Sequence, residues 1–225
     1  MESTDLVSTL GTWQSWHMVE QTAELTTRYD TAANRWRDKM RALGYYDGYL
    51  GFLSEPGPRP APGARVIDVG AGTAAFSEAW VAVNGIPGQL TLLEPSGEML
   101  NRAEAALAPR GVIPERKEDL LREGLNIGPF DEVLAAHIIE HCSDPAQALL
   151  QMRGLLSPGG RLRLVVSKPH WCNAIIWVQW RHRTFGRDEI LGLVEDAGFT
   201  LESEYAFPSG PPSRTSRGIV AIRND

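Results

Sequence analysis

The fold is decided by residues 66–74, which read Val66-Ile67-Asp68-Val69-Gly70-Ala71-Gly72-Thr73-Ala74. The first half is rich in β-branched residues, which is typical of a buried strand, and the second half is a glycine turn leading into a helix. Glycines in such a turn let the backbone approach a ligand closely, and the start of the helix offers free N–H groups. This stretch therefore predicts a ligand-binding turn between a strand and a helix.

Strand-like and helix-like segments alternate from this turn onwards. We expect strands at 65–69, 89–94, 111–116, 130–136 and 161–167, and helices at 74–83, 97–108, 145–156 and 187–197. This alternation implies right-handed crossovers and a mostly parallel sheet with helices on both faces, an α/β fold. Two last strands, 200–207 and 217–222, are joined by a Pro-rich loop without a helix and should pair antiparallel.

A domain boundary precedes the alternating region, at residues 57–63, which contain three prolines and two glycines. Residues 1 to about 53 lack proline and repeat bulky side chains at helical spacing, so we expect two or three helices there. We therefore divide the chain into an N-terminal helical lid (1–60) and a core (61–225). An insertion around 168–186 should contribute to a substrate pocket.

Composition narrows the class of protein. The 225 residues include 22 Lys and Arg against 28 Asp and Glu, a net charge of −6, which argues against non-specific binding to nucleic acid or anionic membranes. The two cysteines cannot form a dense disulfide framework, and the N-terminus lacks a secretory pattern. Apolar runs fall short of the ~20 residues of a membrane span. We expect a cytoplasmic protein, monomeric or homodimeric, without a metal site.

Two acidic residues indicate which ligand the glycine turn binds. Glu94 ends the second strand, 20 residues after Ala74, where an acid accepts hydrogen bonds from ribose hydroxyls. Asp68 would repel the pyrophosphate of a dinucleotide but suits a cationic ligand with an amino group and a sulfonium, such as S-adenosylmethionine. Ala74 stands at the third position of the glycine turn, where dinucleotide-binding proteins also carry alanine. An NAD-binding site is therefore an alternative at this point.

Asp68-Val69-Gly70-Ala71-Gly72 resembles the D/E-x-G-x-G signature of class I S-adenosylmethionine-dependent methyltransferases. The likeness continues in motif order over roughly residues 60–222, including the segments 94–100, 118–120, 130–141, 156–160 and 196–199. It implies a Rossmann-like seven-stranded sheet with an antiparallel last strand, and S-adenosyl-L-methionine as cofactor. The Asp/Asn-Pro-Pro-Phe/Tyr motif is absent after 130–136, which argues against methylation of exocyclic base amines or glutamine amides.

The resemblance also implies a set of cofactor-binding residues. These are Asp68, Gly70, Ala71, Gly72, Glu94, Pro95, Met99, Glu118, Asp119, His137 and Tyr29. Ser96 is expected to cap the helix that follows Glu94, and Met99 to pack on the adenine. Asp119 is favoured over Glu118 as the acceptor for the adenine amino group, and Tyr29 is expected to contact the methionyl end, with a packing role as the alternative.

Tryptophans and histidines gather in three regions that line the acceptor pocket in this family: the N-terminus and the segments after 130–136 and after 161–167. We expect substrate contacts from Trp36, His141, Trp171, Trp177 and Arg181. For the tryptophans, packing in a small satellite core is an open alternative. If a general base is used, His137 is the first candidate and His170 the second, because histidine titrates in the useful range.

Together these features predict methyl transfer from S-adenosylmethionine to an O or N atom of a small molecule. The aromatic-rich pocket segments favour an aromatic or amphiphilic acceptor. Two alternatives remain at this point: a non-catalytic S-adenosylmethionine-binding partner protein, which would keep the same acidic residues, and an NAD-linked oxidoreductase, which Asp68 disfavours.

Overall fold

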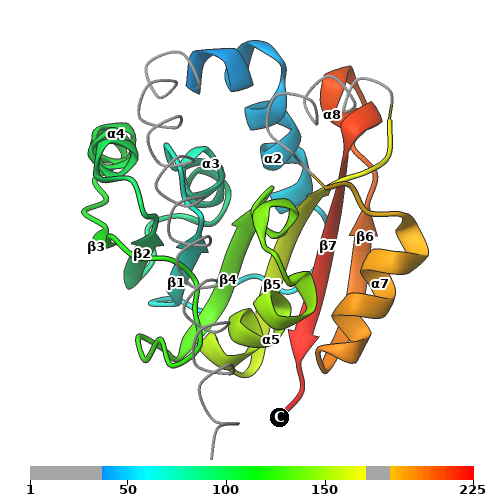
Figure 1. The fold of residues 1–225 in the computed structure, drawn as a ribbon. Helices are drawn as coiled ribbons and strands as arrows, with labels where there is room; N and C mark the ends of the chain where they lie inside the picture. The colour runs from blue at the N-terminus through cyan, green and yellow to red at the C-terminus, as the bar shows by residue number, and fades with distance from the viewer. Residues whose placement is uncertain (1–36, 171–182) are drawn as a thin grey trace, which may run out of the picture.

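A computed structural model of the chain describes residues 37–170 and 183–225. Its centre is a seven-stranded sheet in the order β3-β2-β1-β4-β5-β7-β6 (Figure 1). The strands are β1 (Arg65–Val69), β2 (Gln89–Leu93), β3 (Glu115–Lys117), β4 (Phe130–Ala136), β5 (Leu156–Ser167), β6 (Phe199–Tyr205) and β7 (Ser216–Arg223). Neighbours from β3 to β5 pair in parallel, whereas β7 runs antiparallel to both β5 and β6. This confirms the predicted Rossmann-like sheet with an antiparallel last strand.

Helices follow most of the strands. They are α2 (Tyr45–Leu53), α3 (Ala75–Asn84), α4 (Gly97–Leu107), α5 (Pro145–Leu155), α7 (Arg187–Asp196) and α8 (Gly210–Thr215), with short 3₁₀ turns η1 (Ala108–Arg110) and η2 (Ile139–His141). Residues 37–42 are also helical. None of the helices in the described ranges is long and apolar enough to cross a membrane.

The sheet separates two hydrophobic cores. One lies beneath α2, α3 and α4, and the other lies beneath α5 and α7. Successive residues of a strand point to opposite faces, so Val66 belongs to the first core and Ile67 to the second. Both faces are therefore covered by helices, as the apolar strands predict.

The structure differs from the sequence prediction between the last two strands. The Pro-rich segment that we expect to be a loop contains the helix α8, which has prolines in its first turn. Pro is compatible with the first turn because the N–H groups there have no partner within the helix. A helix of six residues is too short for a parallel crossover, so β6 and β7 still pair antiparallel.

The described part of the predicted lid packs on the core. Tyr49 and Phe52 of α2 are buried, and their rings lie 4.9 and 6.1 Å from that of Phe76 in α3. Phe52 also contacts Phe207, which follows β6. Residues 45–53 therefore join the first core, while the assignment of 1–60 as a lid stays a prediction, because residues 1–36 lie outside the described ranges.

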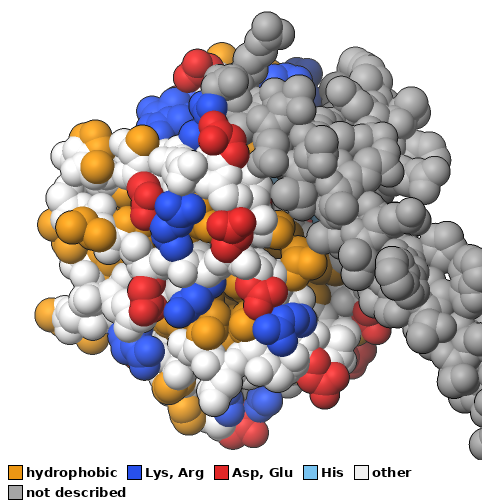
Figure 2. Space-filling view, turned by 60° about the vertical axis from the view of Figure 1, so that its left-hand side comes forward, with side chains coloured by type: hydrophobic (Ala, Val, Ile, Leu, Met, Phe, Trp, Pro, Cys, Tyr) orange, Lys and Arg blue, Asp and Glu red, His pale blue; other side chains and the backbone are white. Residues whose placement is uncertain are grey.

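On the face that carries α4 and β3, acidic and basic side chains are interspersed (Figure 2). Several of them form ion pairs, such as Arg102 with Glu98 on α4 and Arg116 with Glu104. Such exposed pairs contribute little stability, typically below ~1 kcal/mol. They do, however, keep this face from presenting a large field of one sign, in line with the modest net charge.

Candidate functional site

The candidate site lies at the carboxyl edge of the sheet, where β1 and β4 are neighbours. The strand order reverses between these two strands, and ligands of open α/β sheets bind in the crevice at such a switch point. Gly70 follows β1 and Ile138 follows β4, and a Cβ on Gly70 would lie 2.7 Å from the Ile138 side chain. Only glycine allows these two segments to approach so closely.

The glycine turn has the backbone that its sequence predicts. Gly70 and Gly72 have φ values of 67° and 52°, in the left-handed region that favours glycine. Ala74 also has a positive φ, 60°, is fully buried and forms the N-cap of α3. A non-glycine residue in this conformation carries strain, which is common at ligand sites. A Cβ on Gly72 would meet no atom of residues 37–170 or 183–225 within 4 Å, so the described part of the chain leaves room at this turn.

Asp68 is a buried carboxylate at the end of β1, with 1% of its surface exposed. The Ser77 hydroxyl of α3 donates a hydrogen bond to its Oδ2 at 2.6 Å. Burial raises the pKa of Asp68 from 3.8 to about 7, with a smaller contribution from the charge of Glu94. Within the described part of the chain, no Lys or Arg forms an ion pair with Asp68. The site therefore holds a carboxylate that a cationic ligand would stabilise.

Glu94 connects the turns that follow β1 and β2. Its Oε2 accepts the Gly72 N–H at 2.9 Å, and its Oε1 accepts the Ser96 N–H at 3.1 Å. Glu94 is 7% exposed, so its carboxylate is largely shielded from solvent. Glu94 thus links the glycine turn to the segment that follows β2.

The segments after β2 and β3 are placed around the start of α4. The Ser96 hydroxyl accepts the Met99 N–H at 3.1 Å, which confirms Ser96 as the N-cap, and Met99 is buried. The Glu118 carboxylate lies beside Gly97. Asp119 instead pairs with Arg122 at 2.9 Å, which lowers the pKa of Asp119. In this arrangement Glu118 is closer to the start of α4 than the favoured Asp119.

His137 follows β4 and has a φ of 57°. Its N–H donates to the Val165 carbonyl of β5 at 2.8 Å, which fixes this unusual backbone. The ring Nδ1 lies 3.1 Å from the Glu140 Oε1 and 3.1 Å from the Ser167 hydroxyl. With 18% of its side chain exposed, His137 is held on one side by Glu140 and is still partly accessible.

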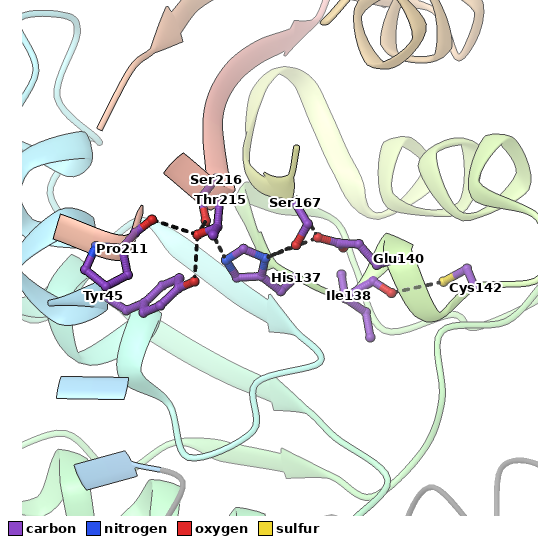
Figure 3. A network of polar contacts seen from close by, with 9 residues as sticks. All are labelled: Tyr45, His137, Ile138, Glu140, Cys142, Ser167, Pro211, Thr215 and Ser216. Carbon is purple, nitrogen blue, oxygen red and sulfur yellow. Dashed lines mark hydrogen bonds and ion pairs between the residues drawn. The ribbon is translucent and has the colours of Figure 1, made fainter. Parts of the chain in front are cut away.

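A chain of hydroxyl groups continues from the other side of the His137 ring (Figure 3). Nε2 lies 3.5 Å from the Ser216 hydroxyl of β7, which is 3.4 Å from that of Thr215. The Thr215 hydroxyl is in turn 2.9 Å from the Tyr45 hydroxyl of α2. Sequence reasoning missed Tyr45, Thr215 and Ser216, because no local pattern marks hydroxyl residues that only the sheet order brings together.

The remaining predicted residues divide into two groups. His141 lies in η2, and burial lowers its pKa; His170 lies just beyond β5 and is half-buried. Across the described ranges, no three His, Cys, Asp or Glu side chains are grouped to hold a metal ion. Five predicted contacts fall outside those ranges: Tyr29, Trp36, Trp171, Trp177 and Arg181.

Comparison with known families gives one match that covers this site. Residues 67–162 match the model of a methyltransferase domain. The match begins in β1 and ends in β5, so it includes the glycine turn, Glu94, His137 and Glu140.

Curated relatives match parts of the chain at moderate sequence identity. A ubiquinone biosynthesis O-methyltransferase of Caulobacter sp. strain K31 is 33% identical over 108 residues, which are 46% of this chain and 41% of that protein. A highly reducing polyketide synthase of Emericella nidulans is 28% identical over 204 residues, 81% of this chain but 7% of the synthase. The chain thus spans about two fifths of the O-methyltransferase and a small part of the synthase.

Solved structures share the fold at low sequence identity. The N1-methyltransferase of 1,6-didemethyltoxoflavin from Burkholderia thailandensis, with S-adenosylhomocysteine bound, superposes with a TM-score of 0.70 at 18% identity, over 92% of this chain and 90% of that one. The N-methyltransferase NodS from Bradyrhizobium japonicum gives 0.66 at 14% identity, over 90% and 98%. Residues 67–162 therefore match a methyltransferase domain, and the sheet order and glycine turn give the chain the fold of these S-adenosylmethionine-dependent methyltransferases.

Proposed function

We propose that this chain binds S-adenosylmethionine at the glycine turn and transfers its methyl group to an O or N atom of a small aromatic or amphiphilic molecule. The observation that carries the proposal is the pair of buried carboxylates, Asp68 in the strand before the glycine turn and Glu94, which accepts the Gly72 N–H of that turn. Within the described residues no basic side chain pairs with Asp68, so its carboxylate favours a ligand that carries positive charge.

The residues present fit the cofactor. Asp68 would hold the amino group of the cofactor, and Glu94 would hold its ribose hydroxyls. Gly72, which has no side chain, would leave room for its amino-acid portion. Met99 and Glu118, at the start of α4, would border the adenine. Bound there, the cofactor supplies an electrophilic methyl group on a sulfonium, so the protein has only to orient the acceptor and manage its proton.

His137 is proposed as the group that takes the acceptor's proton. Its Nδ1 is paired with the buried Glu140, which orients the ring and would stabilise the imidazolium formed on proton uptake. A hydroxyl acceptor must lose a proton to become a good nucleophile, so this arrangement favours methylation at oxygen. The relatives named as O-methyltransferases support the same choice.

The location and assembly of the protein stay predictions. The cytoplasmic assignment rests on the low number of cysteines, and a monomer or a homodimer are both compatible with the chain. The acceptor is proposed as a small molecule because the charge and the missing Pro-Pro motif argue against nucleic acid.

Calorimetric titration tests the proposal directly. We expect S-adenosylhomocysteine to bind with micromolar affinity and NADH not to bind, because Asp68 would repel a pyrophosphate. Asp68→Ala and Glu94→Ala should abolish binding, whereas Glu104→Gln, an exposed acid on α4, should leave it unchanged. Binding of NADH alone would contradict the proposal. Tight binding without methyl transfer to any phenol, catechol or amine in a panel would support the non-catalytic alternative.

With a working acceptor, His137→Gln should lower kcat by about 10²- to 10⁴-fold, the usual contribution of a general base. The affinity for S-adenosylhomocysteine should change little, because the amide keeps the polar character of the position. Single-turnover kinetics would measure the loss, and added imidazole should restore part of it. A variant with unchanged kcat would show that the acceptor needs no base.

A further inference from the structure

The hydrogen-bond partners of His137 on its two sides differ in what they can donate. On the Nδ1 side stands Glu140, whose Oε1 lies 3.1 Å away and also accepts the Ser167 N–H at 2.6 Å. An ionised carboxylate only accepts hydrogen bonds. With Glu140 ionised, Nδ1 carries the proton in this pair, and the Ser167 hydroxyl, 3.1 Å from the same nitrogen, can accept it as well.

On the Nε2 side, the direction of each hydrogen bond follows from the end of the row of hydroxyl groups that lies farthest from the ring. The Thr215 hydroxyl donates to the Pro211 carbonyl at 2.9 Å, so its single hydrogen is used there. Tyr45, 2.9 Å from the same oxygen, must then be the donor to Thr215. The Ser216 hydroxyl lies between Thr215 and the His137 ring and can donate its hydrogen to either of them. An unprotonated Nε2 can accept this hydrogen bond.

From this order we infer that His137 is held as the Nδ1–H tautomer with its lone pair on Nε2, and that Ser216 and Tyr45 are positioning residues for it. The inference rests on the proposed function in one respect, the use of His137 as a base. The lone pair of a base has to face the acceptor, so the tautomer decides whether His137 can act at all.

Tyr45 acts on the ring in two ways. Its aromatic ring meets that of His137 edge-on, with centroids 5.7 Å apart and planes at 77°. Its hydroxyl holds Thr215, and Thr215 precedes Ser216 at the point where α8 passes into β7. Tyr45, Thr215 and Ser216 are all buried, with at most 7% exposed, so water does not replace these contacts easily.

The Ser216 contact is long, at 3.5 Å, which is weak for a hydrogen bond. A hydroxyl of the acceptor could therefore take its place at Nε2 at little cost. Until an acceptor binds, Ser216 supplies the hydrogen bond that keeps the lone pair on Nε2.

The test is ¹⁵N NMR of the imidazole nitrogens in the full chain, at a pH that keeps the ring neutral. His137→Gln identifies the His137 signals among the five histidines. In the wild type we expect Nδ1 with the shift of a protonated nitrogen and Nε2 with that of an unprotonated one. Ser216→Ala should raise the share of the Nε2–H form roughly two- to threefold, the low end of the effect of one hydrogen bond, because the contact is long.

Tyr45→Phe keeps the ring contact and removes only the hydroxyl, so it should move the tautomer ratio in the same direction by a smaller factor. The matched control is Tyr49→Phe, one turn along α2, which should leave the ratio unchanged. A wild-type ring with its proton on Nε2, or equal ratios in all variants, would overturn the inference even if the protein methylates an acceptor. The expected tautomer in a protein that binds no S-adenosylhomocysteine would support the inference and contradict the proposed function.

Discussion

Asp68→Asn is expected to make the protein more stable and, at the same time, to weaken its binding of S-adenosylhomocysteine by at least tenfold. The buried Asp68 carboxylate is destabilising when ionised, which is why its pKa is about 7. Asparagine has nearly the same shape, carries no charge and can still accept the Ser77 hydroxyl. The cofactor's amino group, however, loses its charged partner.

The direction of the stability change with pH follows from the raised pKa. The folded state binds the proton of Asp68 more tightly than the unfolded chain, whose carboxyl has its usual pKa of 3.8. Ionisation of Asp68 therefore lowers the stability of the wild type as pH rises from about 4 through about 7. We expect Asp68→Asn to gain on the order of 2–4 kcal/mol at pH 8 and nothing near pH 4, measured by urea unfolding.

The affinity for ligand should depend on pH in the opposite sense. The amino group of S-adenosylhomocysteine is cationic and prefers the ionised carboxylate, so the wild type should bind this ligand roughly tenfold more tightly at pH 8 than at pH 6. Asp68→Asn should lose this dependence, and Glu104→Gln should behave as the wild type in both measurements. A variant that is less stable than the wild type at pH 8 would show that the carboxylate is stabilised by a partner.

Glu132→Leu should lower the free energy of unfolding by about 3–5 kcal/mol, the usual cost of removing one member of a buried ion pair. Glu132 in β4 is 2% exposed and binds Arg163 of β5 at 2.8 and 3.0 Å. It also accepts the Trp80 indole N–H of α3 at 2.6 Å. The variant leaves a buried guanidinium and a buried indole N–H without their acceptor.

An adjacent surface pair provides the control. Arg161 and Glu202 join β5 and β6 at 2.8 Å and are partly exposed, so Glu202→Ala should cost less than ~1 kcal/mol. Urea unfolding followed by fluorescence would measure both variants. The double variant Glu132→Leu/Arg163→Leu should recover part of the loss, because no charge then remains buried. A loss equal to that of Glu202→Ala would mean that water screens the Glu132 pair.

Much of the fold follows from local sequence. The apolar strands and the Gly70 and Gly72 turn have short-range causes, namely side-chain periodicity and the need for a positive φ. The helix N-cap at Ser96 is equally local. The helix α8 was missed because its prolines indicate a loop, although prolines are also compatible with a first helical turn.

The residues around His137 illustrate what local sequence leaves open. His137 and Glu140 are three positions apart, so their pairing follows from a tight turn. Ser216 reaches the same ring from 79 positions away. Nothing in its neighbourhood marks it, since a buried serine in a strand usually has only a packing role.

The sequence by itself determined the layered α/β fold, the glycine turn and the acids Asp68 and Glu94, because each depends on residues within one strand, turn and helix. Only the tertiary structure decided the surroundings of His137. β7 inserts between β5 and β6, and this brings Ser216 beside the end of β4 while α2 carries Tyr45 to the same point. Such long-range contacts depend on strand order and packing, which no local pattern encodes.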